Sequence, residues 1–168
     1  MDILEVIKTR RSVRRYKSEP ISEDQIDRIL EAGRWAPSAG NSQPWKFTVI
    51  KSKEVKNNLA EALSTGRHIA NAPIGIAVMV NPEASIHSIE DGTAAMQNMI
   101  LEAHSLGLRV NGIGIYGTEQ EERGKEVLDI PKEEQLLFVI AIGHPAESPH
   151  RTRRKISEIT CSDKYGQR

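Results

Sequence analysis

The longest helical pattern in the chain, residues 91–106, is nearly free of charge on one side. A helix whose apolar surface covers so much of its circumference has to be buried, either in the core of one subunit or between two subunits. Gly107 follows at the position where glycine commonly ends a helix in a left-handed conformation. The pattern predicts a long buried helix whose small and apolar members are Ala94, Ala95, Met99, Leu101, Ala103 and Leu106.

Strand patterns lie on both sides of this helix in the sequence. Residues 74–80 form a continuous apolar run rich in β-branched side chains, which predicts a buried central strand. Residues 46–50 and 136–142 predict two further strands, and residues 109–113 can form a fourth. The remaining helices are expected at residues 3–10, 23–35, 53–63 and 119–128.

Several helix starts carry capping residues. Ser22 with Gln25, and Thr118 with Glu121, have the spacing of capping boxes, in which each residue satisfies a backbone N–H group near the other. Asp2 is expected to cap the first helix. The apolar residues of that helix are expected on its buried side, and they are Ile3, Leu4 and Ile7.

Length and composition predict one soluble domain over residues 1–168. Lys+Arg and Asp+Glu are equal at 23 each, which argues against a nucleic-acid-binding module, because such a module usually carries a basic surplus. The longest apolar run is too short to cross a bilayer, and the N-terminus lacks a secretory signal, so we expect a cytoplasmic protein without a membrane partner. The single Cys161 and the histidine spacing predict no disulfide and no metal site.

Positive charge is nevertheless concentrated at two places. Residues 10–16 read RRSVRRY, and a second basic cluster occupies residues 150–155. Two short clusters suit one small, multiply charged anion such as a phosphate, provided that the fold or an oligomer brings them together. The alternative is that these arginines are ordinary solvated surface charges.

The loop at residues 36–45, APSAGNSQPW, gathers neutral hydrogen-bonding side chains between two prolines. Ser38, Asn41, Ser42 and Gln43 can donate and accept at one site, as recognition of a heterocycle edge requires. The alternative is a polar connection that faces water.

Residues 112–117, GIGIYG, match the G-x-G-x-x-G pattern. A dinucleotide fingerprint needs a strand before the motif, a helix opening at it and an acidic residue at the end of the next strand, but the next predicted strand ends at Ile142-Gly143-His144 without an acid. The glycines are better explained by a tight bend, or by a flat stretch of backbone against which a ring system packs.

Taken together, these motifs resemble the FMN-dependent nitroreductase family. RRSVRRY, PSAGNSQPW, the long helix ending in LGL, and GHPAESP followed by basic residues occur in the family's order over residues 3–159. The resemblance implies an α+β fold, with a central mixed or antiparallel sheet flanked by helices, in an intertwined homodimer. The C-terminal arm, residues 144–168, would dock on the partner subunit.

The resemblance also implies the chemistry. NADH or NADPH would reduce FMN, which would pass electrons to a nitroaromatic, quinone or flavin-type acceptor in a ping-pong mechanism. No metal and no catalytic acid or base is expected, because the cofactor carries the chemistry. The implied FMN-binding residues are Arg10, Arg11 and Ser12 at the phosphate and ribityl chain, Arg14 at the N1/O2 side of the ring, Pro37, Ser38, Asn41 and Gln43 from the partner, Gly112, Ile113 and Gly114 beside the ring, and Arg154 and Lys155 at the phosphate.

The sequence leaves some alternatives open. Many relatives carry a larger residue where Gly112 stands, and Arg67 is left without a role in the region where some relatives add a second cation. A specialised reaction such as dehalogenation or flavin remodelling, and a non-catalytic FMN carrier, would share the same motifs. Ordinary structural or surface roles are expected for His68, His87, His104 and His144.

Overall fold

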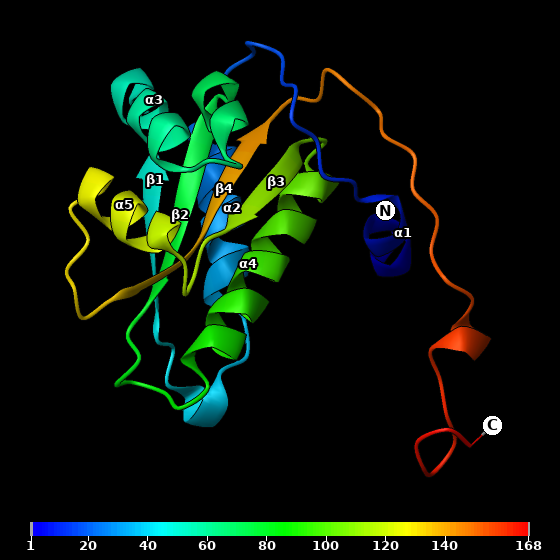
Figure 1. The fold of residues 1–168 in the computed structure, drawn as a ribbon. Coiled ribbons are helices and arrows are strands. Elements are labelled where there is room, and N and C mark those ends of the chain that lie inside the picture. The colour runs from blue at the N-terminus through cyan, green and yellow to red at the C-terminus, as the bar shows by residue number, and fades with distance from the viewer. Residues whose placement is uncertain (1, 168) are drawn as a thin grey trace.

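The computed structural model describes residues 2–167, which form a four-stranded antiparallel sheet with helices on both faces (Figure 1). The strand order is β1-β2-β4-β3. The strands are β1 (Trp45–Ile50), β2 (Ile74–Val80), β3 (Arg109–Gly114) and β4 (Gln135–Gly143). The helices are α1 (Ile3–Thr9), α2 (Glu23–Arg34), α3 (Lys53–Ala62), α4 (Ser88–Ser105) and α5 (Glu119–Val127), with 3₁₀ turns η1 (Ala39–Asn41), η2 (Arg67–Asn71) and η3 (Ile156–Glu158). The predicted α+β class is confirmed.

The sheet separates two apolar clusters. On one face, Ile29 of α2 and Met99 of α4 pack against Ile140 of β4. On the other face, Leu59 of α3 and Ile69 of η2 pack with the opposite side chains of the same strands. Every residue of β2 is buried, as the continuous apolar run predicts for a strand covered on both sides.

Helix α4 begins three residues earlier than predicted. Asp91, expected at its start, lies inside the first turn and is buried. Its carboxylate accepts hydrogen bonds from the Ser85 hydroxyl, at 2.8 Å, and from the backbone N–H of Ala39, at 3.1 Å. The contact with the distant backbone of Ala39 makes Asp91 an anchor for the loop before β1, a role that local helix patterns do not indicate.

One of the two predicted capping boxes forms as expected. The Ser22 hydroxyl accepts from the Gln25 N–H, and the Gln25 side chain accepts from the Ser22 N–H. At α5 the prediction is wrong in its second half. The Thr118 hydroxyl caps the helix, but the Glu121 carboxylate accepts from the N–H groups of Gly117 and Leu136, which joins α5 to β4 instead.

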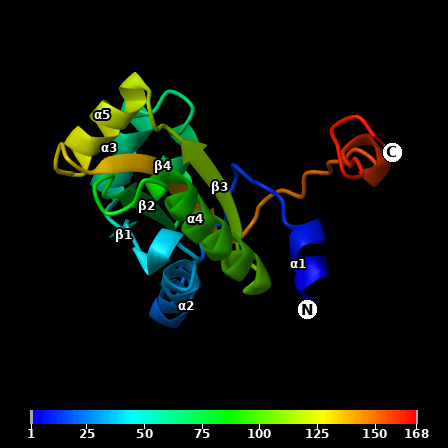
Figure 2. The same ribbon diagram turned by 90° about the horizontal axis from the view of Figure 1, so that it is seen from below.

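Helix α1 differs from the prediction in the face that it buries. Ile3, Leu4 and Ile7 are exposed, Ile3 to 76%, and Val6 is its buried residue. Asp2 occupies the cap position without a side-chain hydrogen bond. The reason is that α1 stands apart from the sheet and touches the body of the chain mainly through α4, as seen from below in Figure 2.

The close packing of α4 on the sheet depends on Gly92. A Cβ at this position would lie 2.6 Å from Cγ1 of Val80 and 2.7 Å from Cδ1 of Leu137. We therefore expect Gly92→Ala to lower the free energy of unfolding by about 1–3 kcal/mol, measured by urea denaturation, because the core is overpacked. Gly114→Ala is the control, since its Cβ would meet Phe138 at an ordinary 3.5 Å. Equal destabilisation by both variants would contradict this account.

Candidate functional site

The RRSVRRY segment, residues 10–16, leaves α1 as an extended chain beside β3. Ser12 forms a parallel bridge with Val110 of β3, and Tyr16 forms an antiparallel bridge with Pro145. The Val13 side chain is 1% exposed and anchors the segment in the core. These contacts hold a strongly basic stretch along the edge of the sheet.

Tyr16 fixes the far end of this segment. Its partly buried hydroxyl shares its one proton between the carbonyl oxygens of Val13, at 2.9 Å, and Ala141, at 3.1 Å. Burial raises the pKa of the phenol, so it remains a neutral donor. The segment is thereby tied to β4 as well as to β3.

Glu147 ties the same segment to the start of the C-terminal arm. Its carboxylate accepts from the backbone N–H groups of Arg14 and Arg15 and from Nε of the Arg15 side chain at 3.1 Å. These hydrogen bonds, led by the one from the Arg14 backbone, lower the pKa of the Glu147 carboxyl. Of the four arginines in residues 10–16, only Arg15 has a carboxylate partner within residues 2–167.

Arg10 and Ser12 are brought together, as predicted for a phosphate site. Nη1 of Arg10 lies 3.4 Å from the Ser12 hydroxyl oxygen. Partial burial, followed by the charges of Arg153 and Arg11, lowers the pKa of the Arg10 guanidinium. In the C-terminal cluster, Arg153 is therefore the residue whose charge acts on Arg10, whereas the sequence pointed to Arg154 and Lys155.

Arg11 is turned away from Arg10 and Ser12. Its Nη1 donates to the carbonyl oxygens of Lys8 and Arg10 at the end of α1, at 2.6 and 2.8 Å. It lines a separate cavity of about 520 Å³, shared with Lys17 and Arg109. The structure thus splits the two adjacent arginines, because side chains alternate in an extended chain.

Near Arg14 lies His68 of η2, for which the sequence predicted only an ordinary structural or surface role. Burial, followed by the charge of Arg14, lowers the pKa of the His68 imidazole, and the Asn111 side chain partly offsets this effect. Arg67, its neighbour in η2, is exposed and lines a different cavity beside α3. His68 is therefore the residue of η2 that approaches Arg14.

The predicted glycines lie on an edge strand. β3 pairs with β4 on one side, and within the described residues its other side pairs only through the bridge of Val110 to Ser12. Gly112 and Gly114 are exposed, whereas the Ile113 side chain is 4% exposed and belongs to the core. A flat ligand at this edge would meet glycine backbone rather than the Ile113 side chain.

The second predicted half of the site, residues 37–43, is a tightly wound loop around η1. Gly40, Asn41 and Gln43 have positive φ values of 57°, 58° and 47°. The Ser38 hydroxyl accepts from the Gln43 N–H at 3.0 Å, and the Gln43 side chain donates to the Asn41 carbonyl at 3.3 Å. These bonds hold a conformation that non-glycine residues rarely adopt.

Within one chain the two halves do not meet. The η1 loop precedes Trp45, which pairs with Val80, and the basic segment lies near Gly143, which pairs with Arg109 at the opposite end of the sheet. Figure 1 shows η1, in cyan, and the blue basic segment at opposite ends of the molecule. A site that uses both needs a second subunit.

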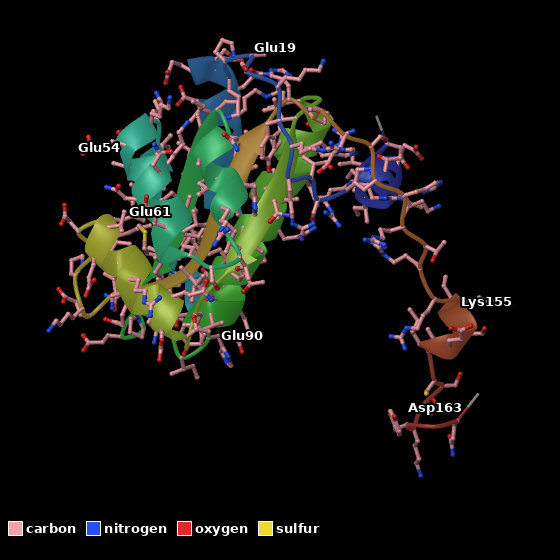
Figure 3. All side chains as sticks on the ribbon, turned by 45° about the horizontal axis from the view of Figure 1, so that its top comes forward. Glu19, Glu54, Glu61, Glu90, Lys155 and Asp163 are labelled. Carbon is pink, nitrogen blue, oxygen red and sulfur yellow. The ribbon has the colours of Figure 1, made fainter. Side chains whose placement is uncertain are left out.

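The C-terminal arm extends away from the body of the chain, with Lys155 and Asp163 far along it (Figure 3). Residues 150–167 are exposed throughout, including the apolar Ile156 at 75%. No group of three or more His, Cys, Asp or Glu side chains within residues 2–167 is placed to hold a metal ion. In the same residues, no helix combines the length and apolar character needed to span a membrane.

Comparison with known proteins assigns the chain to a family. The sequence pattern of the nitroreductase family matches residues 7–67 and 62–144. The chain is a member of the nitroreductase family. A relative from Methanothermobacter thermautotrophicus, named as an NADH dehydrogenase/NAD(P)H nitroreductase, is 37% identical over 155 residues, which are 89% of this chain and 80% of the relative.

Two further relatives connect this nitroreductase-family chain with flavin. The FMN reductase [NAD(P)H] of Bacillus subtilis is 27% identical over 168 residues, covering 87% of this chain and 67% of the relative. A protein from Desulfovibrio desulfuricans, named as a nitroreductase and solved in complex with FMN, is 32% identical with a TM-score of 0.85. The match covers 98% of each chain. The predicted family is therefore confirmed.

The role of Glu147 can be tested through pH. Because its pKa lies below the ordinary 4.5, its bonds stabilise the fold above that pH and are lost as the pH falls through the folded-state pKa. We expect Glu147→Gln to be less stable than the natural protein at pH 7, with the difference in urea midpoint shrinking towards pH 3. Glu133→Gln, at an exposed position before β4, is the control. A difference that does not depend on pH would contradict this assignment.

Proposed function

We propose that this nitroreductase-family protein is an FMN-dependent oxidoreductase that uses NADH or NADPH to reduce nitroaromatic, quinone or flavin-type acceptors. The observation that carries the proposal is the pair of guanidiniums without carboxylate partners, Arg10 and Arg14, beside the open edge of β3. Such a site offers fixed positive charge at two places along a flat backbone surface, which matches a molecule with a phosphate at one end and a ring at the other.

Arg10 and Ser12 fit the phosphate end. The guanidinium supplies fixed charge and the hydroxyl supplies a hydrogen bond, and Arg153 is close enough to act on Arg10 electrostatically. Burial and then repulsion between these cations lower the pKa of Arg10, and a bound anion would relieve the repulsion. We include Arg154 and Lys155 as further phosphate contacts that an ordered arm would add.

Arg14, Gly112 and Gly114 fit the ring end. The glycines carry no side chain that would keep a planar ring from the β3 backbone. Bound FMN would supply the redox chemistry, taking two electrons from NAD(P)H and passing them to the acceptor. Arg14 would hold a positive charge at the electron-rich edge of the ring, which favours reduction. The protein then needs no catalytic acid or base of its own.

We further propose that the working unit is a homodimer whose sites combine both subunits. The support is that Asn41 and Gln43 lie at the opposite end of the sheet from Arg10, so one chain cannot assemble both halves. Exposed apolar residues on α1 and on the arm provide surface for such an interface, among them Ile3, Leu4, Ile7, Ile156 and Ile159. The reductant is a cytoplasmic metabolite, so we assign the protein to the cytoplasm.

The function is tested by the absorbance spectrum of the purified protein after addition and removal of excess FMN. We expect retained flavin bands that bleach when NADH or NADPH is added without oxygen, and that return when menadione or nitrofurazone is added. Bands that stay unbleached with both nucleotides would contradict the reductase and favour a flavin carrier. A folded protein that retains no flavin would overturn the proposal entirely.

The shared site is tested by subunit mixing. Arg10→Ala/Arg14→Ala and Asn41→Ala/Gln43→Ala are each expected to bind FMN at least about tenfold more weakly, because each loses hydrogen bonds or charge at every site. In a mixed dimer, one site regains both natural halves and the other carries both defects. We therefore expect fluorescence titration to recover tight FMN binding after mixing and subunit exchange. Mixing that recovers none would contradict a site built from two subunits.

A further inference from the structure

His104 lies in the last turn of α4 and makes one long-range hydrogen bond. The residue is 3% exposed, and its Nε2 lies 2.8 Å from the hydroxyl oxygen of Thr9. Thr9 is the last residue of α1, and Arg10 follows it directly. A buried side chain of the central helix therefore holds the chain at the point where the basic segment begins.

The hydrogen bonds of Thr9 define the state of the histidine ring. The Thr9 hydroxyl donates its single proton to the carbonyl oxygen of Glu5 at 2.7 Å. Nε2 of His104 must then carry the proton that it shares with Thr9. Nδ1 is buried with no hydrogen-bond partner among the described residues, so the neutral ring leaves it unprotonated.

The surrounding charges favour the same neutral state. Burial, followed by the positive charges of Arg109, Arg10 and Arg11, lowers the pKa of the His104 imidazole. A cation at this position would repel all three guanidiniums, whereas a neutral donor can hold Thr9 without disturbing them. A histidine kept neutral in this way can lie inside a phosphate-binding cluster.

The basic segment is thus fixed on both sides of Arg10. His104 holds Thr9, and the bridge to Val110 holds Ser12. Between these points the backbone changes from helix to an extended conformation, with φ −57° and ψ 130° at Arg10. The direction in which the Arg10 side chain leaves the chain depends on both points.

We propose that His104 is a positioning residue for the phosphate end of the flavin site. Through its hydrogen bond to Thr9, His104 orients Arg10 and Ser12 toward the phosphate. This inference rests on the proposed function. It assigns a role to a histidine that sequence patterns place among ordinary structural residues. It also predicts that the effect of His104 depends on whether the ligand carries a phosphate.

The test compares FMN with riboflavin, which has the same ring and ribityl chain without the phosphate. We expect His104→Leu to weaken FMN binding about tenfold, measured by fluorescence titration, because the Arg10 side chain is no longer held in its orientation toward the phosphate. Riboflavin binding should be unchanged. His104→Gln, whose amide nitrogen can still donate to Thr9, should bind FMN nearly as tightly as the natural protein.

Thr9→Val provides the matched control, since it removes the hydroxyl from the other partner. It should weaken FMN binding to the same extent, and His104→Leu/Thr9→Val should be no weaker than either single variant, because both remove one contact. Folded variants that bind FMN normally, or that lose FMN and riboflavin equally, would overturn the positioning role. Failure of the natural protein to bind FMN would instead overturn the proposed function.

Discussion

The packing of α4 against the sheet is the contact on which both halves of the candidate site depend. Gly92 lets the helix approach Val80 and Leu137 more closely than any larger residue would. From this position the first turn of α4 holds the η1 loop through Asp91, and its last turn holds the end of α1 through His104. One buried helix therefore supports the neutral loop and the basic segment, which lie at opposite ends of the sheet.

Much of the fold could be predicted from the sequence, because the strongest signals are local. The apolar run of β2 and the capping box at Ser22 are set by neighbouring residues, and both are confirmed. The long helix α4 is confirmed as well, with Ala95, Met99 and Ala103 buried as predicted, whereas Ala94, Leu101 and Leu106 are only half-buried. The burial of α1 was predicted wrongly for a physical reason. An apolar stripe predicts that a helix packs against another surface, but the pattern does not say whether that surface belongs to the same chain.

The residues that hold the candidate site together could not be predicted in the same way. Asp91 contacts backbone 52 positions away, His104 reaches Thr9 across 95 positions, and Glu147 reaches Arg14 across 133. Each is a single polar residue in an otherwise ordinary helix or loop, so no local pattern marks it. The basic segment was found because its arginines are adjacent; the residues that orient it are dispersed along the chain.

The double attachment of α4 restricts how its length can change. Asp91 and His104 lie on a single helix of 18 residues, so their relative orientation is fixed by the number of residues between them. Inserting or deleting one residue there would turn one anchor by about 100° relative to the other and shift it by about 1.5 Å. Loops elsewhere in the chain can change length without this penalty. The spacing from Asp91 to His104 is therefore a property that related chains using both anchors must share.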